Sequence, residues 1–175
     1  VSGRKDGVVC VWDTSVTHSR NESVTWPGRI FNWRFAPDSR SVVTLDSEGK
    51  VTRWSGPNFQ ENEPWQLGAK RGLFSPDGRF LAVGSTNGNI SVWDVSRRVL
   101  RREFKPGEGI VVPMGFLAQG NRLVVLLKAG NHLSEWDLAA NREIQSWPAP
   151  PIIEGFGLSP DERLAVGVGW EGDSS

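Results

Sequence analysis

Four tryptophans recur along this chain at nearly equal spacing, each at the end of a short apolar run. Trp12, Trp54, Trp93 and Trp136 lie 42, 39 and 43 residues apart. A fixed period of about 20–50 residues indicates a repeat architecture, in which one supersecondary unit recurs and packs against copies of itself. The period therefore restricts the chain to folds built by stacking similar units.

The segments around these tryptophans align with one another. Residues 35–55 and 74–94 align without a gap, residues 116–137 carry one extra residue, and a further copy begins at Leu158. The chain has 20 glycines and 11 prolines, and its apolar runs are short. This pattern is typical of many short strands separated by turns, and no segment sustains a helical apolar stripe. The sequence therefore predicts an all-β fold.

Each repeat is predicted to hold four strands, named a to d in chain order. A Pro-Asp turn follows strand a in three copies, where aspartate can hydrogen-bond the local backbone. Strands b and c are predicted to join through two-residue hairpin turns at 6–7, 48–49 and 87–88. Four antiparallel strands alone cannot bury both faces of their sheet. Radial stacking of such sheets into a β-propeller solves this problem.

These residues resemble the WD-repeat (tryptophan–aspartate repeat) β-propeller family, in a bacterial style of the repeat, over essentially the whole chain. The recurring residues that carry the resemblance are Trp12, Asp13, Trp54, Trp93, Asp94, Trp136 and Asp137. The resemblance implies four-stranded antiparallel blades, about four blade equivalents in all. Large tryptophans are expected to fill the space between neighbouring blades.

The resemblance also implies a hydrogen-bonded tetrad of Trp, Asp, Ser or Thr, and His in each blade. The first blade matches three members with Ser2, Asp6 and Trp12. Neither histidine of the chain occupies a loop between strand d and the next strand a. We therefore expect the tetrad to be largely lost and the blades to depend mainly on tryptophan packing.

Residues 1–175 are expected to form a single propeller domain or a fragment of one. Full blades are predicted at about 29–68, 69–107 and 108–150, with blade remnants at 1–28 and 151–175. A piece of a longer propeller is the favoured interpretation. A small closed ring and a larger ring shared by two chains are the alternatives. Because Val1 falls inside a repeat, we expect the natural N-terminus upstream, which leaves localisation unknown and cytoplasmic only by default.

Charge and motifs argue against several classes of function. Twenty basic residues balance twenty acidic ones, whereas a nucleic-acid-binding protein usually has a basic excess. The single cysteine, Cys10, provides no disulfide framework, and no apolar stretch approaches the length of a membrane helix. Known nucleophile, metal and phosphate-binding motifs are missing. We therefore predict no catalytic residues, metal, cofactor, nucleic-acid partner or membrane partner.

A basic run at 97–102, with Lys105 beyond it, lies on or beside the predicted outer strand d of the third blade. It can be interpreted as a surface for an anionic partner or as a charged edge that discourages strand addition. The second interpretation is favoured by the sequence.

The leading functional hypothesis is a non-catalytic scaffold that presents propeller rim loops to partner proteins. The alternative is a regulatory or substrate-gating propeller of a larger kinase or peptidase whose catalytic part lies elsewhere. Self-association through open blade edges is a further expectation. The candidate contacts on the rim formed by the b–c and d–a loops are Arg4, Lys5, Arg29, Glu48, Lys70, Arg71, Thr86, Glu108, Lys128, Asn131, Glu154 and Trp170.

Overall fold

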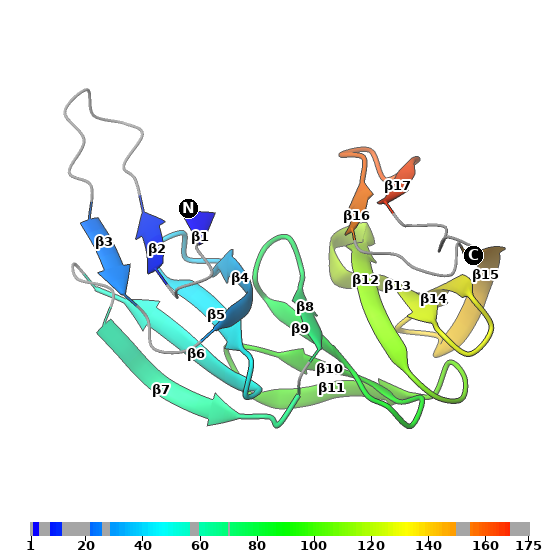
Figure 1. Ribbon diagram of the computed structural model, residues 1–175, viewed down its shortest axis with the longest axis horizontal. Helices are drawn as coiled ribbons and strands as arrows, with labels where there is room; N and C mark the ends of the chain where they lie inside the picture. The colour runs from blue at the N-terminus through cyan, green and yellow to red at the C-terminus, as the bar shows by residue number, and fades with distance from the viewer. Residues whose placement is uncertain are drawn as a thin grey trace, which may run out of the picture. The chain divides into compact units, whose positions relative to one another are not determined.

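A computed structural model of the chain describes residues 2–3, 8–11, 22–25, 29–56, 60–69, 71–149 and 155–168 (Figure 1). The prediction of an all-β fold is confirmed, because the described elements are antiparallel strands apart from one 3-10 turn, η1, at Ala118–Gly120. In each sheet the strands lie side by side in chain order (Figure 1). This is the meander expected of a propeller blade.

The chain divides into two compact units, 1–70 and 71–175. The first unit holds a three-stranded and a four-stranded sheet. The strands of its first sheet are β1 (Ser2–Gly3), β2 (Val8–Val11) and β3 (Glu22–Thr25). The strands of its second sheet are β4 (Ile30–Phe35), β5 (Val42–Asp46), β6 (Lys50–Ser55) and β7 (Gln60–Gln66).

The second unit holds two four-stranded sheets and a two-stranded one. The first of these contains β8 (Gly72–Phe74), β9 (Phe80–Gly84), β10 (Ile90–Asp94) and β11 (Val99–Phe104). The next contains β12 (Val111–Leu117), β13 (Arg122–Leu127), β14 (His132–Asp137) and β15 (Arg142–Pro148). The last pairs β16 (Gly155–Leu158) with β17 (Ala165–Val168). No described sheet closes on itself.

The Pro-Asp turns between strands a and b form as predicted. The carboxylates of Asp38, Asp77 and Asp161 each accept a backbone N–H bond from the residue two positions later. Where the copy at Ala118–Gln119 lacks Pro-Asp, the chain turns through η1 instead. Both of these residues then adopt the left-handed region, with φ of 48° and 54°. Each Pro-Asp turn also has one left-handed residue, directly after the aspartate: Ser39, Gly78 and Glu162, with φ of 55°, 69° and 60°. The turn without Pro-Asp therefore differs in having consecutive left-handed residues.

The prediction of two-residue hairpins between strands b and c is wrong at 48–49 and 87–88, and the turn predicted at 6–7 lies outside the described residues. β5 ends at Asp46 and β6 begins at Lys50, so three residues form that loop. The loop between β9 and β10 is longer still, from Ser85 to Asn89. A longer loop needs positive φ at only one residue, and the glycine supplies it in both cases, at Gly49 and Gly88.

The core of the second unit lies between two facing sheets. Phe80, Ala82, Ile90 and Val92 on one sheet form a buried cluster with β12 and β13 residues of the next sheet, namely Val111, Phe116, Leu123, Val125 and Leu127. Phe104 stacks on Trp136 with ring centroids 4.8 Å apart. Aromatic contacts of this kind add about 0.5–1.5 kcal/mol beyond area burial. The recurring tryptophan of the sheet β12–β15 thus packs against β11, the last strand of the sheet β8–β11.

Three of the recurring tryptophans, Trp54, Trp93 and Trp136, also make a polar contact within their own sheet. The indole Nε1–H of Trp54 donates to Thr44 Oγ1 at 2.8 Å, across to the neighbouring strand. Valine stands at the position of Thr44 in the next two sheets. There the indoles of Trp93 and Trp136 donate to the serine two residues earlier on their own strand, at 3.0 and 2.8 Å. The Ser2, Asp6 and Trp12 side chains lie outside the part of the chain whose side chains are described.

Candidate protein-binding rim

In the second unit, the b–c loops and d–a segments form one continuous rim. Val111 N–H donates to Ser85 O, Lys128 N–H to Ile110 O and Ala149 N–H to Asn131 O, at 3.1, 3.1 and 2.8 Å. Two of these bonds join a b–c loop to a d–a segment, and the bond from Val111 joins a b–c loop to the first residue of β12. Backbone hydrogen bonds therefore hold the rim loops in place, and the side chains of the rim project from this fixed backbone.

The loop at Ser85–Asn89 shows how the local sequence builds this frame. The Ser85 hydroxyl bonds Asn87 Oδ1, and it also accepts the Asn89 N–H at 2.9 Å. Gly88 has φ of 93°, and a Cβ there would overlap the carbonyl oxygen of Gly107. Only glycine satisfies both the backbone angle and this close approach. The turn therefore packs directly on the segment that leads into β12.

The predicted contacts of this rim are exposed but differ in their partners. Arg71, Thr86, Lys128 and Asn131 are exposed, and Asn131 takes the left-handed position of its loop with φ of 45°. Glu108 forms an exposed ion pair with Lys105 at 2.7 Å. Lys105 is a rim residue that the sequence reasoning missed. Its charge, three positions before Glu108, was the available signal.

In the first unit, the corresponding rim contains Glu48 and Arg29. Ser47 N–H donates to Arg29 O at 2.8 Å, which brings the two predicted contacts to adjacent positions. The Arg29 guanidinium lies over the Phe31 ring, 5.6 Å from its centroid. The Glu48 N–H bonds Asp46 Oδ1 at 2.9 Å and its carboxylate is exposed. Five other predicted contacts lie outside the described residues: Arg4, Lys5, Lys70, Glu154 and Trp170.

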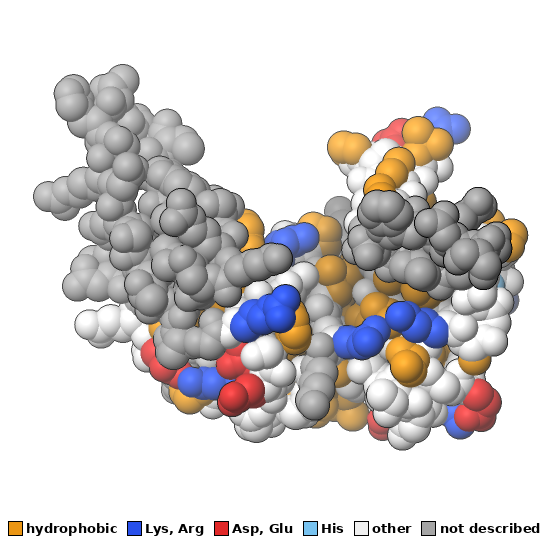
Figure 2. All heavy atoms as spheres, in the orientation of Figure 1, with side chains coloured by type: hydrophobic (Ala, Val, Ile, Leu, Met, Phe, Trp, Pro, Cys, Tyr) orange, Lys and Arg blue, Asp and Glu red, His pale blue; other side chains and the backbone are white. Residues whose placement is uncertain are grey.

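A cleft of about 290 Å³ lies between β13–β15 and the β16–β17 pair. Its walls include Trp147, Phe156 and Leu158, and the buried Glu135 lies at its side. The exposed face of β17 carries hydrophobic atoms, visible in orange over β16 and β17 in Figure 2. The cleft lies on the face of the sheet β12–β15 opposite the face that packs against β8–β11.

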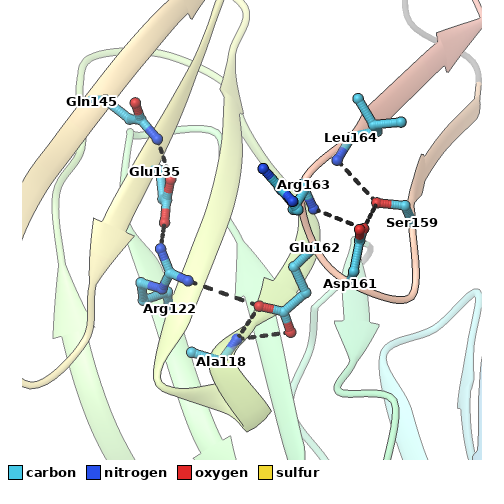
Figure 3. Close-up of polar contacts among 9 residues, drawn as sticks. All are labelled: Ala118, Arg122, Glu135, Gln145, Ser159, Asp161, Glu162, Arg163 and Leu164. Carbon is cyan, nitrogen blue, oxygen red and sulfur yellow. Dashed lines mark hydrogen bonds and ion pairs between the residues drawn. The ribbon is translucent and has the colours of Figure 1, made fainter.

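A polar chain beside this cleft links two neighbouring sheets (Figure 3). Glu135 accepts Arg122 Nη1–H at 2.5 Å and Gln145 Nε2–H at 2.7 Å. Arg122 also lies 3.8 Å from Glu162, whose carboxylate accepts the Ala118 N–H at 2.8 Å. The chain thus attaches the β16–β17 turn to the sheet before it. These charged side chains bond to one another and connect the two sheets, so we assign them a structural role.

The family model described as WD domain, G-beta repeat (WD40) matches residues 68–94, which include β8, β9 and β10. This segment of the chain matches a WD repeat. WD repeats generally mediate binding between proteins and are typically non-catalytic. The recurring Trp93-Asp94 at the end of β10 lies inside the match.

Two relatives are similar to the chain over 93% of its length. It is 25% identical over 173 residues to Protein groucho of Drosophila melanogaster and covers 24% of that protein. It is 24% identical over 176 residues to apoptotic protease-activating factor 1 of Rattus norvegicus and covers 14% of it. The chain therefore spans about a quarter or less of each relative.

The two WD aspartates of the second unit serve their own turns. Burial raises the pKa of Asp94, but N–H and hydroxyl donors from Arg97 and Ser96 outweigh this and hold it below its ordinary value. The Ala140 N–H, followed by smaller contributions, likewise lowers the pKa of Asp137. Within the described part of the chain, no three His, Cys, Asp or Glu side chains group as metal ligands, and no helix has the length and apolarity to cross a bilayer.

Proposed function

We propose that this WD-repeat chain is a non-catalytic scaffold that binds partner proteins through the rim of b–c loops and d–a segments. The observation that carries the proposal is the hydrogen-bonded frame of the second unit, which ties its loops at Ser85, Ile110 and Asn131. Loops held in this way lose little conformational entropy on binding. The exposed side chains above them are free to differ without disturbing the blades.

The rim of the second unit favours a partner surface with some negative charge. Arg71 and Lys128 are exposed, and neither forms a side-chain ion pair with a described residue. Glu108 is already paired with Lys105. The remaining predicted contacts, including those of the first unit, are proposed as parts of the same surface.

Charge reversal tests this proposal. The variant Arg71→Glu/Lys128→Glu is expected to weaken partner binding roughly tenfold or more, because like charges facing each other across an interface are unfavourable. Arg142→Glu is the matched control, since it reverses an exposed arginine at the start of β15, at the opposite end of that sheet. Partners are identified by affinity capture with the wild type, and their affinities for the three purified forms are then measured by calorimetry. Equal affinity of all three forms contradicts a rim-binding function.

A second candidate function follows from the relatives. One of them is named a protease-activating factor, and the chain covers only a small share of its length. The propeller would then regulate or gate a larger kinase or peptidase whose catalytic part is outside this sequence. The parent reading frame decides this, because a kinase or hydrolase motif set beside the repeats is required.

Self-association through sheet edges is part of the same proposal. β11, β15 and β17 each have a neighbour on one side only among the described strands. Such edges offer unpaired N–H and C=O groups to another strand. Light scattering at increasing protein concentration measures this directly, and a constant monomer mass argues against it.

A further inference from the structure

Five arginines gather around one end of the sheet β8–β11, and we call this set the arginine surface: Arg79, Arg97, Arg98, Arg101 and Arg102. The antiparallel register explains why they meet. Asp94 at the end of β10 pairs with Phe80 on one side and with Val99 on the other. The a–b turn before β9, the c–d turn and the start of β11 therefore share one end of the sheet.

Two of these arginines are held by an aromatic ring. The guanidinium carbons of Arg79 and Arg101 lie 4.9 and 4.3 Å from the centroid of the Phe80 ring. Phe80 itself is buried in the core, so its ring is a fixed platform. A β-bulge between Val92 and Trp93 shifts the register of β11 and leaves Arg101 without a directly opposite residue. Stacking places the planar guanidinium groups while leaving their N–H edges available to an anion.

The acidic groups nearby, Asp77 and Asp94, accept hydrogen bonds from their own turns but keep their negative charge, and Asp94 interacts electrostatically with Arg97 and Arg79. Asp77 accepts the Ser75 hydroxyl and the Arg79 N–H, at 2.6 and 3.1 Å. Asp94 accepts the Ser96 hydroxyl and the Arg97 N–H, at 2.8 and 3.1 Å. Among the described residues, no carboxylate lies within ion-pair distance of the Arg79, Arg101 or Arg102 side chains. The one acid on β11 is Glu103, which is exposed, so the five arginines face three carboxylates (Asp77, Asp94 and Glu103) and the surface keeps a net charge of +2.

Two exposed apolar side chains lie between the arginines along the chain, and the one that pairs with Asp94, Val99, shares the sheet face of Phe80. Val99 and Leu100 are 50% and 45% exposed, and they lie between the turn at Arg97–Arg98 and Arg101. Arg98 also has φ of 56°, the left-handed region, where the next sheet has Asn141 with φ of 53°. Asparagine tolerates this region better than arginine does. The repeat therefore has a positive charge at Arg98 although arginine is unfavourable at this backbone angle. Charge and apolar contact together suit a peptide rather than a free anion.

We infer that the arginine surface is a second protein-binding site, separate from the rim, which takes an acidic peptide segment with apolar residues between its carboxylates. Carboxylate or phosphoserine side chains would accept hydrogen bonds from the N–H edges of Arg79 and Arg101, and an aliphatic side chain would cover Val99 on the same sheet face. A balanced net charge favours a local contact of this kind over nucleic-acid binding, which needs a broad basic field. This inference does not depend on the proposed rim function.

Fluorescence anisotropy with short labelled peptides tests the inference on the full chain. The probe alternates glutamate with leucine, its phosphoserine form replaces two glutamates, and its neutral form carries glutamine instead. We expect the acidic probe to bind more tightly than the glutamine probe and to lose affinity as salt increases. Arg79→Gln and Arg101→Gln should each weaken binding about two- to fivefold, the range measured for single exposed ion pairs, and about tenfold together.

A matched control distinguishes this surface from general charge. Arg40 occupies the same turn position in the repeat as Arg79, but Ser41 follows it where Phe80 follows Arg79. Arg40→Gln removes the same charge and should leave the affinity unchanged. Arg101→Lys keeps the charge but loses the planar group over the ring, so we expect an affinity between those of the wild type and Arg101→Gln.

Several outcomes overturn the inference. These are equal binding of acidic and glutamine probes, equal losses for Arg40→Gln and Arg79→Gln, or tighter binding of a single-stranded oligonucleotide than of either acidic peptide. If Arg71→Glu/Lys128→Glu abolished peptide binding and Arg79→Gln/Arg101→Gln did not, the peptide would bind at the rim and not at the arginine surface. Circular dichroism and urea unfolding of each variant ensure that a loss of binding is not a loss of folding.

Discussion

Replacing Arg122 by methionine tests the charged pair on the face of the sheet β12–β15. Glu135 is only 2% exposed, and its two oxygens accept N–H bonds from Arg122 and Gln145. Methionine keeps much of the apolar stem of arginine but donates no hydrogen bond. The carboxylate then remains buried with a single neutral donor.

The expected loss of stability follows from the burial of the two groups. Removing one partner of a buried ion pair costs about 3–5 kcal/mol. The Arg122 side chain is 38% exposed, so water reaches the vacated side of the carboxylate and we expect the lower end, about 3 kcal/mol. The exposed contact with Glu162 adds less than about 1 kcal/mol. With a urea m-value of about 2 kcal/mol per molar, the midpoint falls by about 1.5 M.

The preceding sheet provides the control. Phe80 and Val92 occupy the positions of Arg122 and Glu135 there, with the same pairing across the strands. Exchanging a buried ion pair for apolar residues is often neutral, so Arg122→Phe/Glu135→Val should unfold within about 1 kcal/mol of the wild type. Urea titrations followed by tryptophan fluorescence compare the three proteins. A loss below about 1 kcal/mol in Arg122→Met, or a double variant as unstable as Arg122→Met, would refute the reasoning.

Three other expectations concern turns and indole contacts. Gly88→Ala should lower the free energy of unfolding by about 2 kcal/mol, because φ of 93° and the Gly107 carbonyl both exclude a Cβ; an unchanged urea midpoint speaks against this. Ser134→Ala removes the acceptor of the Trp136 indole and should cost about 1 kcal/mol, and NMR should show the indole N–H resonance shifted; an unmoved resonance contradicts the assignment. Burial raises the pKa of Asp38, but the N–H, hydroxyl and guanidinium donors around it hold that pKa well below its usual range. Its stabilising effect is therefore complete above the unfolded-state pKa of about 3.9 and is lost as the pH falls toward the folded-state pKa, so Asp38→Asn should flatten the acid limb of stability measured by urea unfolding; an unaltered limb excludes this role.

The order of the strands was predictable because the repeat supplies its own internal comparison. Asp38 and Asp77 occupy the same position after strand a, and both serve the backbone of their turn as predicted. Loop length was harder to predict, because glycine fits both a two-residue hairpin and the last position of a longer loop. Gly49 takes the second role, and only the start of β6 at Lys50 reveals it.

Partners across strands were outside the reach of local patterns. Ser91 and Ser134 replace the hydroxyl of Thr44 from a different strand, so a search at the expected tetrad position misses them. The stacking of Arg101 on Phe80 joins residues on the first and last of three neighbouring strands. Such contacts depend on the register and on a bulge, neither of which leaves a fixed spacing in the sequence.

Phe80 and Val92 are apolar, whereas Arg122 and Glu135 at the same repeat positions are charged. This difference determines which neighbour each of the two four-stranded sheets in the second unit can pack against. The first pair is complementary to the apolar back of β12–β13, and the second to the β16–β17 turn with its Glu162. A sheet placed out of order would leave Glu135 against an apolar neighbour and without Glu162 beside its arginine partner. The repeats are therefore similar enough to stack but are not interchangeable. The few polar residues on the faces of the sheets specify the order in which the blades pack.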